Sequence, residues 1–184
     1  MGLALMRFPS ARGRFIRLGP SRHEMLRLVP MTEEEFEEAM HRAIPRRAAN
    51  GVRRGQWKEE DALEAARAEY AGFYPQGLHS PGHTFLKVVD EETGARVGET
   101  WYVAEPEGGK IRFWINWIWI DPEFRRRGYA KEVLAQLGKE ASRRGADRIG
   151  LYVFADNPNA IDLYSKLGFV TQSLGMVKPL EPPG

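Results

Sequence analysis

The sequence of 184 residues contains no cysteine, and it has no long apolar run. Without thiols, disulfides, zinc–thiolate centres and a catalytic cysteine are excluded, and a reducing compartment is permitted. No apolar stretch approaches the roughly 18 residues that a membrane-spanning helix needs. Charge also interrupts residues 1–7 too early for a signal peptide. We therefore expect a cytoplasmic protein without a membrane partner.

Positive charge is unevenly distributed along the chain, although the net charge is only +2. Residues 1–24 carry five arginines and one glutamate, among prolines and glycines that break regular structure. This composition predicts a loosely structured basic extension at 1–24, followed by a single domain at 25–184. Because the domain itself is not basic, we expect no nucleic-acid partner.

Apolar periodicity and turn residues predict a single mixed α/β domain. The predicted strands are 26–29, 84–89, 97–103, 113–120 and 149–154, with a last pair through 169–171 and 176–177, and the predicted helices begin near Thr32, Glu59, Tyr129 and Ala160. Thr32 followed by Glu35 is a capping-box signature. Seven of the eight residues in 113–120 are apolar or aromatic, which is typical of a central strand buried on both faces.

The segment 118–131 is predicted as a strand, an Arg/Gly loop and the start of a helix. The first N–H groups of a helix have no backbone acceptors, and the helix dipole is positive there, so phosphate can bind. Gly128 permits a close approach, and three consecutive arginines at 125–127 add charge that suits phosphate oxygens. A solvated basic loop is the alternative. The rival motifs GxxxxGK[ST] and GxGxxG are missing, which disfavours nucleotide hydrolysis and dinucleotide binding.

A second segment, directly after the strand predicted at 149–154, distinguishes between these alternatives. The chain reads Arg125-x-x-Gly128-x-Ala130 and then Asn157-x-x-Ala160-x-x-Leu163-Tyr164-x-x-x-Gly168-Phe169. This pair of motifs resembles the GNAT acetyltransferase superfamily, and residues 25–180 are similar throughout to the small bacterial YycN-type N-acetyltransferases. The resemblance implies a mixed, mostly antiparallel sheet of about six to seven strands, splayed at an acetyl-CoA site and flanked by four helices.

The resemblance also implies which residues bind acetyl-CoA, with no metal required. Backbone groups on the central strand would pair with the pantetheine arm, and N–H groups of the Arg/Gly loop and first helical turn would hold the pyrophosphate. An asparagine would hydrogen-bond the pantetheine or the acetyl end. Carried over onto this sequence, the set is Ile118, Trp119, Ile120, Arg125, Arg126, Arg127, Gly128, Tyr129, Ala130, Lys131 and Asn157.

Catalytic roles follow less directly from the residues. Tyr164 would lie near the sulfur and donate a hydrogen bond or proton to the leaving thiolate, and a core aromatic is the alternative. Glu99 and Glu105 are candidate bases for the attacking amine, and surface carboxylates are the alternative for both. Asn116 stands where related sequences often carry an aspartate. Tyr152 stands where acetyltransferases of protein N-termini carry a catalytic glutamate, which argues against such substrates.

We therefore expect an acetyl-CoA-dependent N-acetyltransferase that acts on a small-molecule amine by direct attack. A protein or peptide amine is the alternative acceptor, and a non-catalytic acetyl-CoA sensor is the alternative function. A homodimer is compatible with the resemblance. His79 and His83 are interpreted as loop histidines, because no third metal ligand lies near them. Trp117 and Trp119 are predicted to share one face of their strand and to serve in core packing or in an acceptor pocket.

Overall fold

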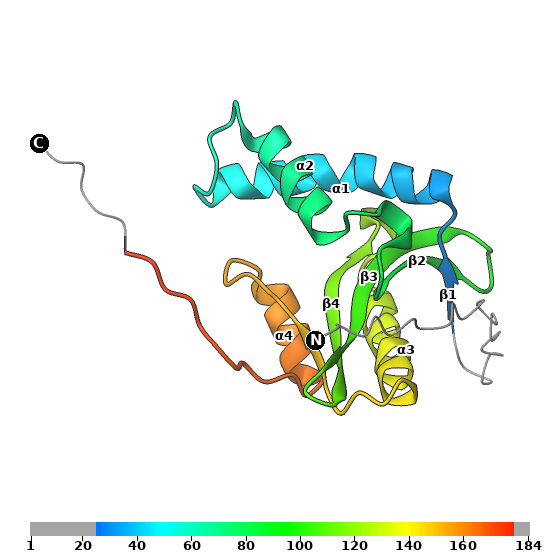
Figure 1. Cartoon of the computed structure of the whole chain (residues 1–184). Helices are drawn as coiled ribbons and strands as arrows, with labels where there is room; N and C mark the ends of the chain where they lie inside the picture. Colours follow the sequence, from blue (N-terminus) through cyan, green and yellow to red (C-terminus); the bar gives the residue numbers. More distant parts are fainter. Residues whose placement is uncertain (1–24, 179–184) are drawn as a thin grey trace, which may run out of the picture.

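The computed structural model describes residues 25–178, and the basic extension predicted at 1–24 lies outside them. Within these residues, four α-helices and five strands follow one another along the chain, and Figure 1 labels all of them except β5. Their bounds are β1 Leu26–Pro30, α1 Glu33–Arg53, α2 Ala62–Phe73, β2 His83–Asp90, β3 Arg96–Glu107, β4 Lys110–Ile120, α3 Tyr129–Arg143, β5 Ile149–Leu151 and α4 Pro158–Lys166, with short 3-10 turns at Gly77–His79 and Pro122–Phe124.

The five strands form one sheet in the order β1-β2-β3-β4-β5. All pairs are antiparallel except β4 and β5, which are parallel. The expected mixed α/β class with four helices is confirmed. The expected count of six to seven strands is wrong for residues 25–178.

The missing strands are the last predicted pair, because residues 169–178 form no regular structure. Figure 1 shows this segment running away from the sheet. Met176 and Val177 are 92% and 95% exposed, so they face solvent rather than a core. Their apolar character predicted a strand, but a strand also needs a neighbouring edge for its backbone groups.

Strand β4 contains a β-bulge at Asn116. Trp101 of β3 lies opposite Trp117, and the next residue, Tyr102, lies opposite Ile115, so Asn116 has no counterpart on β3. Pairing between β4 and β5 also stops at Ile115. A bulge bends its strand and increases the twist. Beyond Asn116, β4 is therefore unpaired on the β5 side, and the strand predicted at 149–154 is shortened to three residues.

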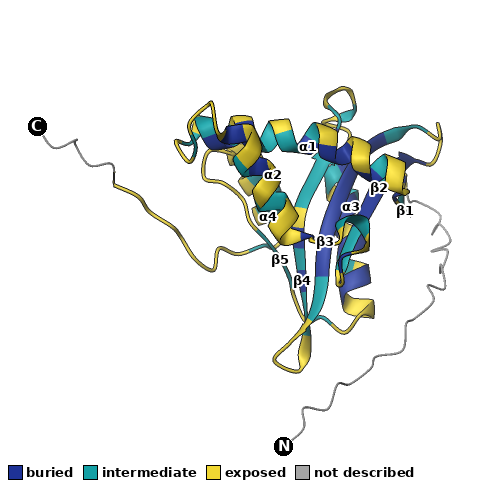
Figure 2. Cartoon of the chain, turned by 45° about the horizontal axis from the view of Figure 1, so that its top comes forward, coloured by how far each residue is buried: buried dark blue, intermediate teal, exposed yellow. Residues whose placement is uncertain are grey.

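Two helical layers cover the two faces of the sheet. On one face, α1 and α2 pack on an aromatic cluster that contains Phe36, Tyr74 and Trp101. On the other face, α3 supplies Val133 and Leu137 to the larger core, and α4 packs against that core. Figure 2 shows the consequence, since β3 is buried along most of its length and the helices expose their outer faces.

The predicted start of α1 is confirmed by its hydrogen bonds. The Thr32 side chain accepts from the N–H of Glu35, and the Glu35 carboxylate accepts from the N–H of Thr32. Trp117 and Trp119 share a face of β4 as predicted, because they lie opposite Trp101 and Glu99, which are two residues apart on β3. That face is the one covered by α1 and α2. Within residues 25–178, no helix combines the length and the apolar character needed to cross a membrane.

Replacing Gly150 with valine should destabilise the fold by overpacking. A Cβ at this position would lie 2.3 Å from the ring of Trp114, its partner across the β4–β5 pair. Overpacking costs about 1–3 kcal/mol, and in a domain of this size each kcal/mol lowers Tm by roughly 2–4 °C. Thermal unfolding followed by circular dichroism measures the change. Gly138→Ala is the control, since its Cβ meets nothing within 4 Å and it should not lower Tm.

Candidate active site

The loop before α3 has the backbone geometry of an anion site. Gly128, the N-cap of α3, has φ +85°, and no side chain caps this helix. Arg126 has φ +64°, which is uncommon for a residue with a side chain. Alternation between left-handed and ordinary backbone turns successive N–H groups toward one concavity, and the helix dipole adds positive potential. The space where a Cβ of Gly128 would lie is open to 4 Å. A diphosphate group fits this arrangement.

The three loop arginines have different partners. The Arg125 Nε donates to the carbonyl of Ile120 at 2.9 Å, and its guanidinium lies 4.7 Å from the ring centroid of Trp119. Arg127 Nη2 donates to the carbonyl of Glu123 at 3.3 Å. Arg125 therefore holds the loop against the end of β4, whereas all three arginines remain solvent-exposed.

The backbone from Ile118 to Ile120 forms the β4 edge that leads to this loop. In the part of the chain that the structure describes, β5 pairs only with Phe113–Ile115, which leaves this edge without a strand partner. Unpaired backbone N–H and C=O groups on a strand edge can bind an extended ligand as an added strand. The loop and the edge are continuous, so one ligand can reach both.

The two predicted site residues of α4 occupy different environments. The Asn157 Oδ1 accepts from the N–H of Ala160 at 3.2 Å and so caps α4. Its Nδ2 group is the part that can still donate to a ligand. Tyr164 packs against the larger core and contacts the ring of Phe169. Burial raises the pKa of the Tyr164 hydroxyl, so this group stays protonated at neutral pH.

Glu99 lies in an environment that its sequence did not indicate. Its side chain is fully buried, so the alternative of a surface carboxylate is wrong for this residue. Arg42 and Arg46 of α1 each donate from Nη2 to one of its oxygens at 3.0 Å. Arg96 Nη1 lies 3.5 Å away. A buried carboxylate needs such partners, because its desolvation is otherwise too costly.

Glu105, the other candidate base, is far from the open edge. It is half-buried and accepts hydrogen bonds from Nε and Nη2 of Arg112, its partner on β4. Arg112 precedes Asn116 by four residues, which is roughly 13 Å along a strand. Glu105 therefore lies far along the sheet from the edge at 118–120.

Several residues near the open edge were missed by the sequence analysis. The Arg46 guanidinium lies 3.8 Å from the ring centroid of Trp119. Tyr70 of α2 contacts the ring of Trp117, and burial raises the pKa of Tyr70 to about 12. A usable signal was the spacing of Arg42 and Arg46, which places both on one face of a helix beside the apolar stripe of Met40 and Ala43.

A second missed contact joins α1 to the segment after β5. Arg54 donates from Nη2 to Asp156 at 2.9 Å, and its guanidinium lies 3.4 Å from the ring centroid of Phe154. Arg53 donates to the same carboxylate at 3.2 Å. These bonds lower the pKa of Asp156, since they favour its charged form. The C-terminal part of α1 therefore lies next to the two backbone segments that diverge beyond the bulge.

His79 and His83 have different partners. His79 Nε2 lies 2.6 Å from Glu33. His83 is the first residue of β2 rather than a loop residue, and its Nδ1 accepts from Trp101 Nε1 at 3.1 Å. Burial lowers the pKa of His83. Within residues 25–178 no group of three or more His, Cys, Asp or Glu side chains is arranged to hold a metal ion.

Beyond the bulge, β4 and the parallel strand β5 no longer pair, and the helix that follows β4 begins after a glycine N-cap. The chain belongs to the acetyltransferase (GNAT) family, whose model matches residues 46–169. It is 33% identical over 153 residues to the uncharacterized N-acetyltransferase YdgE of Bacillus subtilis, with 83% of this chain and 97% of that protein covered. YycN of the same organism is 33% identical over 155 residues, with the same shares covered.

Structural comparison agrees with the sequence matches. The crystal structure of YycN from Bacillus subtilis has a TM-score of 0.79 at 32% identity, and the match covers 85% of this chain and 99% of that chain. The chain is therefore an N-acetyltransferase of the GNAT family, and membership of this family implies acetyl-CoA as the acetyl donor.

Replacing Gly128 with alanine should weaken acetyl-CoA binding. The new methyl group would enter the open concavity, and a residue with a side chain resists φ +85°. We expect Kd for acetyl-CoA to rise at least about tenfold, equivalent to about 1.4 kcal/mol. Isothermal titration calorimetry measures it. Gly145→Ala imposes similar backbone strain at φ +86° beyond the other end of α3, and it should leave Kd unchanged. An equal loss in both variants would contradict the assignment of the loop.

Proposed function

We propose that this acetyltransferase transfers the acetyl group of acetyl-CoA directly to a primary amine of a small molecule while both substrates are bound. The observation that carries the proposal is the continuity of two features at one end of the sheet. These are the uncapped N-terminus of α3 at Gly128 and the unpaired β4 edge at 118–120.

Each feature suits one part of the donor. Acetyl-CoA supplies an acetyl group activated as a thioester, at the far end of an extended arm from its diphosphate. N–H groups of residues 126–131 bind the diphosphate, and the backbone of Ile118, Trp119 and Ile120 pairs with the arm. An N–H that the sheet no longer uses stabilises negative charge developing on the carbonyl oxygen. Asn157 donates from its amide group near the acetyl end.

The attacking amine must lose a proton. An alkyl amine has a pKa near ~10 and is mostly protonated at pH 7. Both oxygens of Glu99 bind arginines and its side chain is fully buried, while Glu105 lies far along the sheet, so neither carboxylate is positioned to take the proton. Beyond Ile115, β4 and the segment after β5 no longer pair, and we call the space between them the gap. We propose that solvent takes the proton of the amine at the open end of this gap, where Asn116 and Tyr152 are exposed.

Tyr164 supplies a hydrogen-bond donor for the leaving thiolate. A thiol has a pKa near ~8.5, well below that of a phenol, and burial raises the pKa of Tyr164 further. Full proton transfer from Tyr164 is therefore uphill, whereas hydrogen bonding to the thiolate is favourable. Because burial raises the pKa of Tyr164, the protonated form needed for this role is present at neutral pH.

The release of free thiol from acetyl-CoA tests the proposal directly. The acceptors are amino acids, polyamines, aminoglycosides and short peptides, each compared with a reaction lacking acceptor. Thiol release that depends on a small amine supports the proposal. Release only with peptides would assign a protein or peptide acceptor instead. Tight acetyl-CoA binding without release by any amine would identify a sensor.

Replacing Tyr164 with phenylalanine should lower kcat at least about tenfold, within the range usual for groups that assist proton movement. The ring and its contact with Phe169 are retained, so Tm should change little. Steady-state thiol release at saturating acetyl-CoA gives kcat, and thermal unfolding verifies the fold. Unchanged kcat would remove the hydroxyl from the mechanism.

Replacing Glu105 with glutamine should leave kcat/KM within about twofold, because Glu105 and Arg112 form a half-exposed ion pair away from the open edge. The same assay across pH 6–9 measures it. We also expect kcat/KM of both proteins to rise with pH in parallel, as the acceptor amine loses its proton. Loss of activity together with a changed pH profile in the variant would restore Glu105 as the base.

A further inference from the structure

We propose that the acceptor carries a carboxylate beside its amine and that Arg46 binds this carboxylate. The inference rests on the proposed function and names the class of acceptor, an amino acid or a similar amphoteric amine. It excludes polycationic amines as preferred substrates.

Arg46 is positioned beside the open edge and retains donors for a ligand. Its guanidinium stacks on Trp119, at 3.8 Å from the ring centroid, in the part of β4 that β5 does not pair with. Only its Nη2 has a hydrogen-bond partner among the described residues, the buried Glu99. The side chain is 26% exposed, so its other nitrogens can be reached. Its remaining N–H groups can therefore donate to the oxygens of a carboxylate.

Arg46 has less carboxylate compensation than its neighbours. Arg42, Arg46 and Arg96 all lie within 3.5 Å of the Glu99 carboxylate, but Arg42 also lies 3.7 Å from Glu38, and Arg96 lies 3.4 Å from Asp121. Among the described residues, Glu99 is the one carboxylate that pairs with Arg46, and it is shared. In the segment after β5, Arg53 and Arg54 share a single aspartate, Asp156. Incompletely compensated arginines attract an anionic group and disfavour a polycation.

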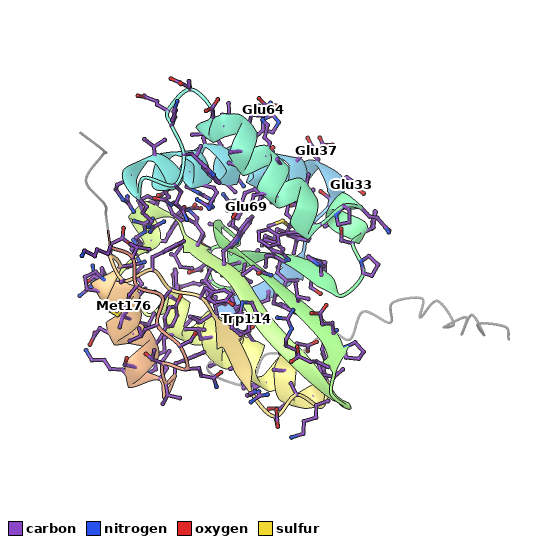
Figure 3. The ribbon with its side chains drawn as sticks, turned by 60° about the vertical axis from the view of Figure 1, so that its left-hand side comes forward. Glu33, Glu37, Glu64, Glu69, Trp114 and Met176 are labelled. Atoms are coloured by element: carbon purple, nitrogen blue, oxygen red, sulfur yellow. The ribbon has the colours of Figure 1, made fainter. Side chains whose placement is uncertain are left out.

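Acidic residues of the helical layer do not supply a further partner for Arg46. Figure 3 shows Glu33, Glu37 and Glu64 pointing away from the sheet and Glu69 lying between α2 and the sheet. The inward Glu69 is paired with Arg47 at 2.7 Å. The helical carboxylates labelled there are therefore in solvent or already neutralised.

Matched acceptors test the proposal. Thiol release is measured with α-amino acids and with their α-carboxamides, which keep the amine and lose the negative charge, and with spermidine. We expect kcat/KM to be at least about tenfold higher for the acids, equivalent to about 1.4 kcal/mol. Equal values for acid and amide, or a preference for spermidine, would overturn the proposal.

Variants then test the role of Arg46. Arg46→Gln should abolish the preference for acids, chiefly by raising their KM, and leave KM for acetyl-CoA unchanged. Arg46→Lys should restore part of the preference, because it keeps the charge but not the paired donors. Arg27→Gln, at an exposed arginine on β1, should change nothing. Retention of the preference in a folded Arg46→Gln protein would contradict the assignment.

Binding measurements separate this inference from the proposed function. Each acid and its amide are titrated calorimetrically into the full chain saturated with CoA, for the original sequence and for Arg46→Gln. If no amine releases thiol, the proposed function fails. Binding of acids that Arg46→Gln removes would still support the carboxylate site, and indifference to the substitution would overturn it.

Discussion

The interruption of β4 at Asn116 is the constraint on which the site depends. A bulge bends its strand and increases local twist, so the backbone after Leu151 cannot follow β4 beyond Ile115. Backbone groups that a continuous sheet would use are then left on β4, and such groups need partners. Among the described residues, the bulge thus leaves an edge of β4 from beyond Asn116 to Ile120 that runs directly into the loop before α3. The gap between β4 and the segment after β5 therefore forms without an inserted loop.

A second constraint is the burial of Glu99 beneath α1. Removing one partner from a buried ion pair costs about 3–5 kcal/mol, because a charge is left without compensation. Arg42 and Arg46 lie on one face of α1, so the carboxylate fixes how this helix lies against β3. The same contacts fix the position of the Arg46 guanidinium over Trp119. A residue that looks like a candidate base in sequence is therefore better explained as an anchor for an arginine.

Local features of the fold could be predicted from the sequence. The helix predicted near Tyr129 begins there, and Gly128 adopts the positive φ that only glycine adopts readily. The bulge was not predictable in the same way, since its residue is one polar position within an apolar strand. For that reason the apolar run 149–154 suggested a strand twice as long as the three residues that pair.

Long-range contacts account for the rest of what the sequence did not indicate. Glu99 and Arg46 are 53 positions apart, and neither residue type by itself predicts burial. The apolar residues at 169–177 suggested two strands by their type, but strand formation depends on an edge that this segment does not pair with. Sequence reasoning therefore described the loop and the start of α3, which belong to one stretch of chain, better than the contacts between α1 and β3.

Trp119 connects the loop before α3 with α1. Arg125 stacks on its ring from that loop, and Arg46 contacts the same ring from α1. Its Nε1 donates to Asp121, which in turn lies 3.4 Å from Arg96 in the Glu99 cluster. Since one indole ring contacts both guanidinium groups, it fixes how the proposed acceptor subsite at Arg46 lies relative to the loop proposed to bind the diphosphate.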